Sequence, residues 1–180
     1  NRLKEFGETI KELFNDDLAL NKEVIVDGFA NRDETYGANK IVDGDYDTYW
    51  APDNSSKTGT IEIDLGESKE FDVISLQEYI PLGQRVSSFN VEVLQGENWN
   101  KVYEGKTIGY KRLVRIAPTK GEKIRINITG SLEVPLINNV GVYKQPTSIE
   151  LPSGPPAGLK VLNDDNIKNT SSKYYENRKL

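Results

Sequence analysis

An alternation of apolar and polar residues with a period of two constrains the fold of this chain more than any other feature. It begins near residue 24, and in residues 60–65 it places Ile61, Ile63 and Leu65 on one face. This pattern is typical of strands with one buried face. Turn signals such as Gly96 separate the segments and predict an all-β fold, an antiparallel β-sandwich. The alternating segments are residues 60–65, 73–78, 89–94, 99–103, 112–116, 123–128 and 139–143, with turns expected at 95–98, 105, 118–121 and 130–131.

The N-terminal segment follows a helical period instead. Between residues 2 and 14, apolar side chains recur at spacings of three and four and form one stripe. A single amphipathic helix in front of a β-sandwich has little to pack against. We therefore predict that residues 1–22 are the end of a preceding domain and a linker. The stripe consists of Leu3, Phe6, Ile10, Leu13 and Phe14.

The alternation ends near residue 145, so the predicted sandwich comprises residues 23–145. Residues 151–158 are rich in Pro and Gly, a composition suited to an extended linker. Residues 159–180 show no apolar pattern of their own. We predict a linker and tail over residues 146–180, and the alternatives for the tail are disorder, a strap along the sandwich or the start of another module.

The composition of the 180 residues excludes several classes of function. A net charge of −5 provides no basic surface for polyanions, so nucleic acid is not expected as a partner and a neutral ligand fits better. The absence of Cys and His removes thiolate nucleophiles, Cys-based zinc sites and the commonest general base. No apolar run approaches the roughly 20 residues of a membrane span. Because the chain begins with Asn and contains no Met, we expect a fragment or a processed product.

Residues 38–50 contain an oxygen-rich loop, called the acidic loop below. Its candidate oxygen ligands lie at residues 43–48, and it leads into Tyr49 and Trp50. The oxygens of Asp43, Asp45, Asp47 and Thr48 could surround one Ca²⁺, which prefers six to eight oxygen ligands. The spacing is not that of an EF-hand, which needs a Glu at its twelfth position and a helix on each side. The alternative is a solvated acidic turn without a metal.

Several motifs carry a resemblance to known families. The run 41–50, together with residues 140–143, resembles the coagulation factor 5/8 type C (discoidin-like) family, whose fold is a galactose-binding-like jelly roll. Residues 77–86 and 107–112 resemble the C-terminal part of the family 29 glycoside hydrolases, the α-L-fucosidases, and residues 2–7 fit the end of their catalytic barrel. The resemblance extends to about residue 144.

This resemblance implies an accessory module of a secreted or periplasmic enzyme, and therefore an extracellular or periplasmic location. The parent protein is similar to retaining α-L-fucosidases, whose two carboxylates lie in a barrel outside this chain, so no catalysis is expected here. The implied work is weak contact with glycans that contain galactose or fucose. A purely structural buttress of the barrel is the alternative. Adhesion to protein or phospholipid ranks last, because no exposed apolar side chains are expected on the loops.

The resemblance also implies a set of calcium ligands. In the related family 32 carbohydrate-binding modules, the Asp-Gly loop and a Glu before the last strand hold the ion. The corresponding ligands are the Lys40 carbonyl, the Asp43 side chain, the Asp45 carbonyl and the Thr48 oxygens, and Asn139 stands in place of the Glu. An amide lacks the charge and the bidentate capacity of a carboxylate, so a structural Ca²⁺ is expected to bind more weakly or to be lost.

The candidates for sugar contact lie in loops, where a rigid sandwich presents variable residues. Arg85 could donate several hydrogen bonds to vicinal hydroxyls, and Tyr36 or Tyr79 could stack on the apolar face of a sugar ring. For Arg85, an ion pair with Glu78 or burial against the barrel is equally open. The remaining candidates are Gln84, Tyr110 and Arg32.

The two tryptophans are expected to have structural roles. Trp50 follows the acidic loop and precedes Pro52, so we expect it to pack beneath the loop as core; the alternative is a platform for a sugar ring. Trp99 lies in an alternating segment, so we expect a core or cross-strand aromatic.

Overall fold

The structure is a computed structural model that describes residues 7–8, 11, 14–30, 33–53 and 55–145. The chain divides into two compact units, Asn1–Pro146 and Thr147–Leu180, and all described residues belong to the first. Gly7, Glu8 and Lys11 are helical, as predicted for residues 2–14. The rest of that stripe except Phe14, and the predicted linker and tail 146–180, lie outside the described residues, so the domain boundaries stay predictions.

Every strand pairing in the described residues is antiparallel, and the strands form one sheet of six strands in the order β1-β2-β5-β3-β4, with β6 paired to β2. Short 3₁₀ turns precede β2 and β3. The strands are β1 (Glu23–Val26), β2 (Gly59–Glu78), β3 (Val86–Gln95), β4 (Asn98–Gly105), β5 (Arg112–Ser131) and β6 (Ile137–Tyr143), and the turns are η2 (Glu34–Tyr36), η3 (Ala38–Ile41) and η4 (Ile80–Leu82).

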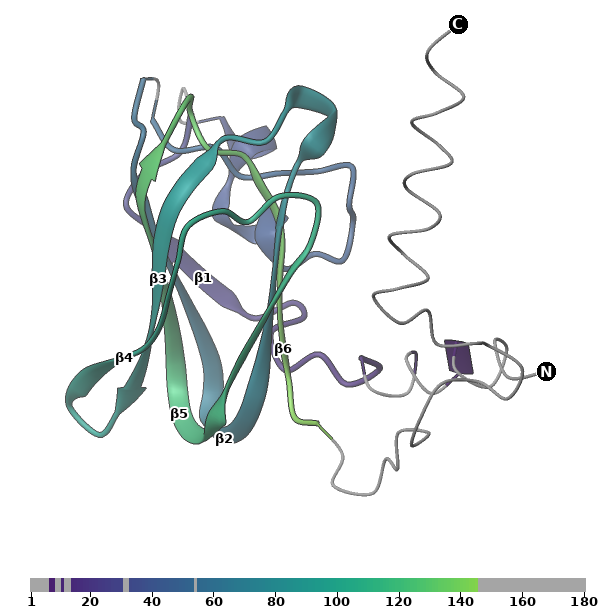
Figure 1. Cartoon of the computed structure of the whole chain (residues 1–180), viewed down its shortest axis with the longest axis vertical. Helices are drawn as coiled ribbons and strands as arrows, with labels where there is room; N and C mark the ends of the chain where they lie inside the picture. Colours follow the sequence, from purple (N-terminus) through teal and green to yellow (C-terminus); the bar gives the residue numbers. More distant parts are fainter. Residues whose placement is uncertain (1–6, 9–10, 12–13, 31–32, 54, 146–180) are drawn as a thin grey trace, which may run out of the picture. The chain divides into compact units, whose positions relative to one another are not determined.

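β2 and β5 pass from one layer of the sandwich to the other. Each has 20 residues, and Figure 1 shows both bending at the same end of the molecule. The first half of β2 pairs with β1 and the second half of β5, whereas residues 73–78 pair with β6. Register shifts at Asp64/Lys69 and Phe71/Val73 mark the bend. The folded-over sheet confirms the predicted jelly-roll-like β-sandwich.

The prediction of a turn at residues 118–121 is wrong, because these residues continue β5 through the bend. Gly121 is required there by close approach of β3, since a Cβ at this position would lie 2.9 Å from the carbonyl oxygen of Leu94 and still closer to Val93. The glycine that suggested a turn is therefore a site of tight packing. The turn at residues 95–98 is confirmed, because Gln95 pairs with Asn98 across Gly96, whose φ is +63°.

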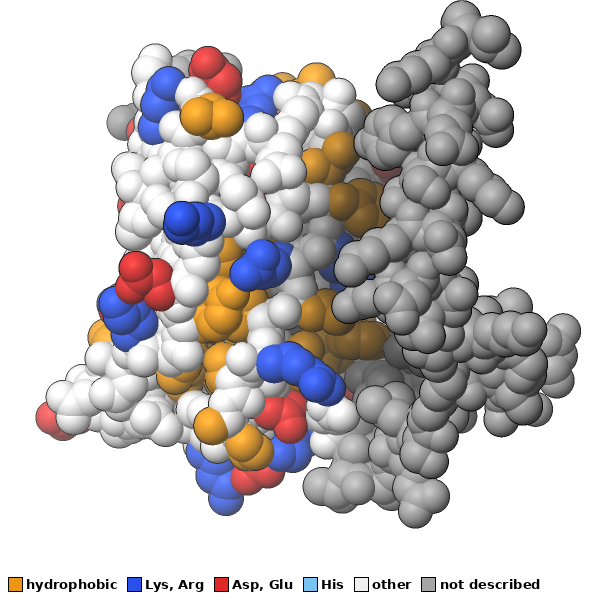
Figure 2. Space-filling model, viewed as in Figure 1, with side chains coloured by type: hydrophobic (Ala, Val, Ile, Leu, Met, Phe, Trp, Pro, Cys, Tyr) orange, Lys and Arg blue, Asp and Glu red, His pale blue; other side chains and the backbone are white. Residues whose placement is uncertain are grey.

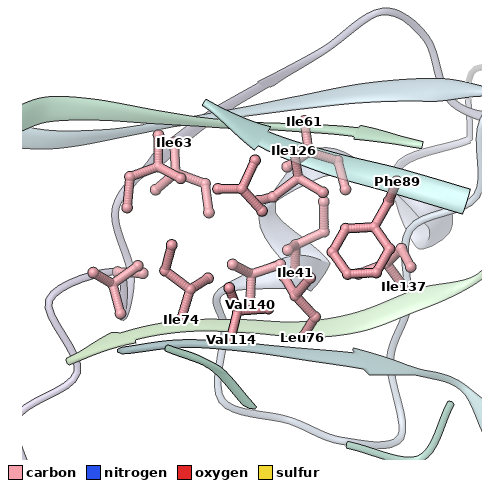
Figure 3. Close-up of a cluster of buried hydrophobic side chains, with 14 of the residues drawn as sticks. Ile41, Ile61, Ile63, Ile74, Leu76, Phe89, Val114, Ile126, Ile137 and Val140 are labelled. Carbon is pink, nitrogen blue, oxygen red and sulfur yellow. The ribbon is translucent and has the colours of Figure 1, made fainter. Parts of the chain in front are cut away.

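The core lies between the two layers (Figure 3). One layer contributes Ile61, Ile63 and Ile126, and the other contributes Ile74 and Val140, all at most 1% exposed. This is the burial that period-two alternation predicts.

The expectations for both tryptophans are confirmed. Trp50 is 0% exposed, and its indole N–H donates to the Gly28 carbonyl at 2.9 Å. Trp99 pairs with Leu94 and lies under the guanidinium of Arg125, whose carbon is 3.7 Å from the ring centroid.

Figure 2 shows hydrophobic side chains in the middle of one face of the molecule, flanked by Lys and Arg side chains. Val102, Tyr103 and Ile116 are partly buried and pack against the core. No helix among the described residues is long and apolar enough to cross a membrane.

Candidate functional site

A row of three tyrosines lies where three loops of the sandwich meet. The row joins η2, the end of the acidic loop and the residue before η4. The rings of Tyr49 and Tyr79 stack with centroids 4.6 Å apart and an interplanar angle of 27°, and Tyr36 lies 5.4 Å from Tyr49. Aromatic pairs at these separations favour each other by about 0.5–1.5 kcal/mol beyond the area they bury. These ring contacts hold the three loops together, and the rings stay partly accessible to solvent.

The tyrosine row rests on a small apolar base, and each ring remains partly exposed. Partial burial raises the pKa of Tyr49 above its ordinary value, and the neighbouring Tyr36 adds to the rise. The positive charge of Arg85 acts in the opposite direction and lowers this pKa. The central ring therefore lies within reach of the Arg85 charge. The base consists of Ala30, Ala51 and Leu136.

Arg85 is held at this end of the sandwich by backbone carbonyls. Its Nη1 donates to the Val134 carbonyl at 2.8 Å, and its Nη2 and Nε donate to the Leu82 carbonyl at 3.0 and 3.3 Å. A guanidinium carries five N–H donors, so these contacts leave it capacity for a ligand. The predicted alternative, an ion pair between this guanidinium and Glu78, is wrong.

Glu78 instead binds three backbone N–H groups. Its Oε1 accepts from Arg85 at 2.7 Å and from Val86 at 2.9 Å, and its Oε2 accepts from Gly109 at 2.7 Å. The side chain is only 2% exposed. Charge-assisted hydrogen bonds to backbone donors satisfy a buried carboxylate and fix its neighbours. Glu78 therefore fastens the loop that carries Arg85 to the loop that precedes Tyr110.

Two other predicted contact residues, Gln84 and Tyr110, lie next to the backbone groups that Glu78 binds. Arg32 is outside the described residues. Gln84 is exposed and lies beside Gly109, because a Cβ there would be 3.3 Å from the Gln84 Oε1. Tyr110 is 78% exposed. The structure thus brings Tyr36, Tyr79 and Arg85 together, places Gln84 beside Arg85 in the same loop, and places Tyr110 on the adjacent loop.

Two leucines contradict the expectation that the loops carry no exposed apolar side chains. Leu82 is 52% and Leu132 is 69% exposed. Both flank Arg85, since its guanidinium binds the Leu82 carbonyl and its own carbonyl accepts the Leu132 N–H at 2.8 Å. A ligand at Arg85 would meet apolar surface beside the charged group.

The acidic loop brings three of the predicted ligand oxygens together. Thr48 Oγ1 lies 2.9 Å from Asp43 Oδ2 and 3.1 Å from the Asp45 carbonyl. These contacts are hydrogen bonds within the loop, so their spacing fits the metal-free acidic turn as well as oxygens that share one Ca²⁺ at about 2.3–2.6 Å. The predicted ligand of Lys40 is its carbonyl, whereas its ammonium lies 3.8 Å from Asp43 Oδ2, where a positive charge would compete with an ion.

Asn138 of β6 provides a side-chain hydrogen bond to this loop, beside the backbone pair between Trp50 and Ile137. Its Nδ2 donates to the Tyr46 carbonyl at 2.9 Å, while its buried Oδ1 has no partner. Asn139, the predicted ligand, pairs with Gln77 of β2 and is 6% exposed. The described residues contain no group of three or more His, Cys, Asp or Glu placed to hold a metal. An ion here would depend on Asp43, Thr48 and carbonyl oxygens.

A comparison with protein families matches an F5/8 type C domain to residues 26–140. The chain belongs to this family. The F5/8 type C domain is 38% identical to a GH29 fucosidase of Ruminococcus gnavus solved with fucose, with a TM-score of 0.77 over 84% of this chain and 31% of that chain. A chitosan-binding module of Paenibacillus sp. IK-5 shares the fold, with a TM-score of 0.63 at 22% identity over 71% of this chain and 99% of that chain.

Curated relatives of the F5/8 type C domain are fucosidases. It is 28% identical to alpha-L-fucosidase 1 of Arabidopsis thaliana over 78% of this chain. It is 35% identical to a fucosidase relative of Oryza sativa subsp. japonica over 82% of this chain. The chain spans 29% of the length of each relative. The resemblance to family 29 α-L-fucosidases is thus confirmed.

Two residues of the site, Tyr49 and Asn138, were not singled out from the sequence, and Glu78 was named only as a possible ion-pair partner of Arg85. Tyr49 is the centre of the tyrosine row, yet it follows directly on the acidic loop and carries no separate signal. Glu78 lies at the end of an alternating strand. Its three partners are backbone N–H groups, which no residue pattern in the sequence indicates. Asn138 was overlooked beside Asn139, because a bulge between Ile137 and Asn139 shifts the register.

Proposed function

We propose that this F5/8 type C domain is a glycan-binding accessory module of an α-L-fucosidase and that it does not itself catalyse hydrolysis. The observation that carries the proposal is the row of Tyr36, Tyr49 and Tyr79 beside the carbonyl-anchored guanidinium of Arg85. Aromatic faces and fixed donors are the groups that bind the apolar face and the hydroxyls of a sugar. A fucosidase relative solved with fucose supports a glycan that contains fucose, and galactose is the second sugar that we propose.

Binding at this site is expected to be weak. A dissociation constant near 1 mM corresponds to about −4 kcal/mol, which one stacked ring and a few hydrogen bonds supply. Weak binding suits a module beside an active site, because tethering raises the local substrate concentration while release stays fast. An enzyme that acts on extracellular glycans fits an extracellular or periplasmic location, which forms part of the proposal.

Calcium would have a structural role in this proposal. Asp43, Thr48 and the Asp45 carbonyl supply oxygens at spacings that suit the ion, and the unpartnered Oδ1 of Asn138 lies beside the same loop. Bound calcium would fix the loop that ends in Tyr49 and so stiffen the tyrosine row.

A shift titration tests the sugar proposal. The ¹⁵N-labelled 180-residue chain is titrated with galactose, N-acetyllactosamine, fucose and a fucosylated trisaccharide, first with calcium and then with chelator. Saturable shifts are expected near residues 79–85 and 49. Tyr36→Ala should weaken them, whereas Tyr46→Ala, which removes a tyrosine that is 54% exposed outside the row, should leave them unchanged.

The absence of saturable shifts up to about 50 mM sugar would favour the buttress instead, since weaker binding would be worth less than about 2 kcal/mol. Exposed Tyr110 and Leu113, 78% and 46% accessible, would then belong to the contact with the catalytic domain.

A further inference from the structure

A groove with both polar and apolar walls lies on the outer face of the layer built from β1, the first half of β2, the second half of β5 and β3. It has a volume of about 380 Å³ and shares no lining residue with the tyrosine row. Thr60 and Glu62 of β2 line it, together with Arg125 and Asn127 of β5. They alternate with core residues of the same strands and so point away from the core. The volume falls within the roughly 300–1,000 Å³ of small-molecule sites.

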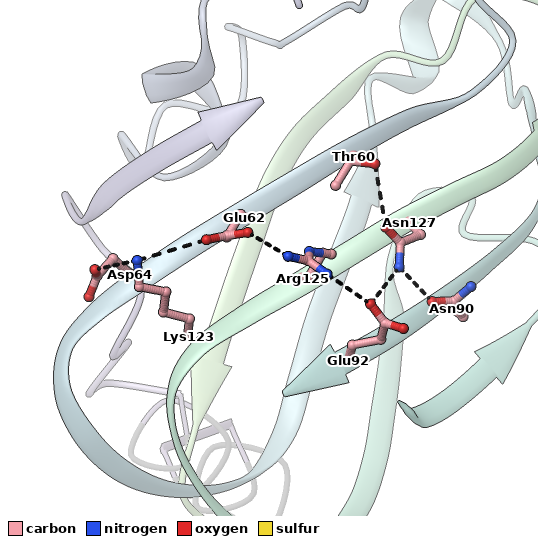
Figure 4. A network of polar contacts seen from close by, with 8 residues as sticks. All are labelled: Thr60, Glu62, Asp64, Asn90, Glu92, Lys123, Arg125 and Asn127. Carbon is pink, nitrogen blue, oxygen red and sulfur yellow. Dashed lines mark hydrogen bonds and ion pairs between the residues drawn. The ribbon is translucent and has the colours of Figure 1, made fainter. Parts of the chain in front are cut away.

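Arg125 is the fixed centre of this face (Figure 4). Its Nη2 is 3.0 Å from Glu62 Oε2, and its Nη1 is 3.5 Å from Glu92 Oε2. The ring of Trp99 packs against the same guanidinium, with its centroid 3.7 Å from the guanidinium carbon. The side chains of Arg125, Glu62 and Glu92 remain 27%, 22% and 25% exposed. Their orientation is thus set while one side still faces solvent.

Asn127 is oriented in the same way. Its Nδ2 donates to Asn90 Oδ1 at 2.8 Å and to Glu92 Oε2 at 3.0 Å, and its Oδ1 accepts from Thr60 Oγ1 at 3.4 Å. Figure 4 shows these residues in a row that crosses three neighbouring strands. Groups that are already ordered lose little conformational entropy when a ligand binds.

The wall of the groove on the β1 side adds an apolar surface and a further acceptor. Ile25 is 55% exposed although it lies in a strand, so it presents hydrocarbon to the groove. Asp27 follows β1, and its Oδ2 accepts the Thr60 N–H at 3.1 Å. The lining thus contains two carboxylates, Asp27 and Glu62, and one guanidinium, so an anionic ligand is disfavoured.

We propose that this groove is a second glycan-binding site, separate from the tyrosine row, which takes a neutral oligosaccharide of two or three units. A sugar hydroxyl both donates and accepts, so it matches a face where the remaining donors of Arg125 lie among the acceptors of Glu62, Asp27 and the Asn127 Oδ1. The apolar face of a pyranose ring suits Ile25. The ion pairs of Arg125 with Glu62 and Glu92 could stabilise the sheet without an exposed apolar side chain beside them, so stabilisation alone does not account for Ile25.

A titration of the 180-residue chain with 2′-fucosyllactose, xylotriose, chitotriose and anionic 3′-sialyllactose tests the proposal. At least one neutral sugar should give saturable amide shifts at residues 25–27, 60–62 and 125–127, and 3′-sialyllactose should give weaker ones. Asn127→Ala should weaken this binding about tenfold. Thr129→Ala is the matched control, because it removes a side chain from the same strand and face outside the groove.

Two further variants keep the test decisive. Ile25→Glu alters an exposed side chain without a packing role and should also weaken binding. Tyr36→Ala disrupts the tyrosine row and should leave the groove shifts unchanged, so failure of the proposed loop site and failure of the groove can be told apart. The proposal is overturned if no neutral sugar produces saturable groove shifts, if Asn127→Ala and Ile25→Glu bind as the wild type does, or if 3′-sialyllactose binds equally well.

Discussion

Replacement of Glu78 by Gln tests whether one buried carboxylate organises the loops of the proposed sugar site. The wild-type side chain accepts three backbone N–H groups at 2.7, 2.9 and 2.7 Å and is 2% exposed. The glutamine side chain in the Glu78→Gln variant would have the same shape but only one acceptor oxygen. If that oxygen remains with Arg85 and Val86, the side-chain amide faces the N–H of Gly109, so one hydrogen bond is lost.

The cost follows from these contacts. A hydrogen bond to a charged group contributes about 1.5–3 kcal/mol, and a neutral one about 0.5–1.5 kcal/mol. Loss of the Gly109 bond, weakening of the other two and a smaller cost of burying the neutral side chain together predict about 3 kcal/mol of lost unfolding free energy. For a chain of this size each kcal/mol lowers Tm by about 2–4 °C.

Urea unfolding and thermal melting of wild type and variant measure this loss directly. Glu104→Gln is the matched control, because Glu104 forms only a surface pair with Lys101 at 2.6 Å and its side chain is 71% exposed. It should change stability by less than about 0.5 kcal/mol. The reasoning is refuted if Glu78→Gln costs less than about 1 kcal/mol, or if the Gly109 amide shift does not change.

Three other experiments probe the ion, a partly buried acid and the core. Calcium at about 100 times its Kd should stabilise the chain by about 2.7 kcal/mol, and chelator should reverse the rise in Tm. Asp43→Ala should abolish this rise, and Glu97→Ala, which removes an exposed carboxylate outside the loop, should retain it. Equal responses of the two variants would contradict a bound ion. Burial raises the pKa of Asp17 despite its hydrogen bonds, so the folded state binds the proton more tightly than the unfolded state does. The stability of the wild type should therefore fall relative to that of Asp17→Asn as pH rises from about 4 to 7. A difference in urea unfolding free energy that stays constant with pH would show that there is no such linkage. A Cβ on Gly59 would lie 2.6 Å from the Trp50 ring, so Gly59→Ala should cost about 1–3 kcal/mol in urea unfolding, and wild-type stability would show that the ring relaxes freely.

The sequence predicted the strands well because burial of alternate residues is a local signal. All seven alternating segments lie in strands, but residues 60–65 and 73–78 are two halves of one strand, β2. A strand that bends between layers has the same glycine and polar residues at its bend as two strands separated by a turn. Only pairing with β6 and β5 distinguishes these arrangements, and pairing is a long-range property.

The tyrosine row was predicted in part, because its outer members lie in loops that a sandwich presents at its end. Tyr36 and Tyr79 stood out as aromatics in such loops. Tyr49 did not, because its position between them depends on how three loops converge. The contacts of Glu78 and Arg85 are with backbone atoms, and any residue type could supply those atoms, so no residue pattern encodes them.

Arg85 and Arg125 show why position in the fold decides what an arginine can do. Both guanidinium groups are oriented before a ligand arrives, but backbone carbonyls hold Arg85, whereas two carboxylates and the Trp99 ring hold Arg125. Carbonyl partners leave Arg85 its full charge in an apolar setting of tyrosines and leucines, which suits one sugar ring. Carboxylate partners neutralise Arg125 and surround it with acceptors, which suits several hydroxyls of a longer neutral chain. If both proposals hold, loss of charge by Arg85→Gln should weaken binding of monosaccharides more than that of oligosaccharides. Substitutions around Arg125 should show the opposite preference.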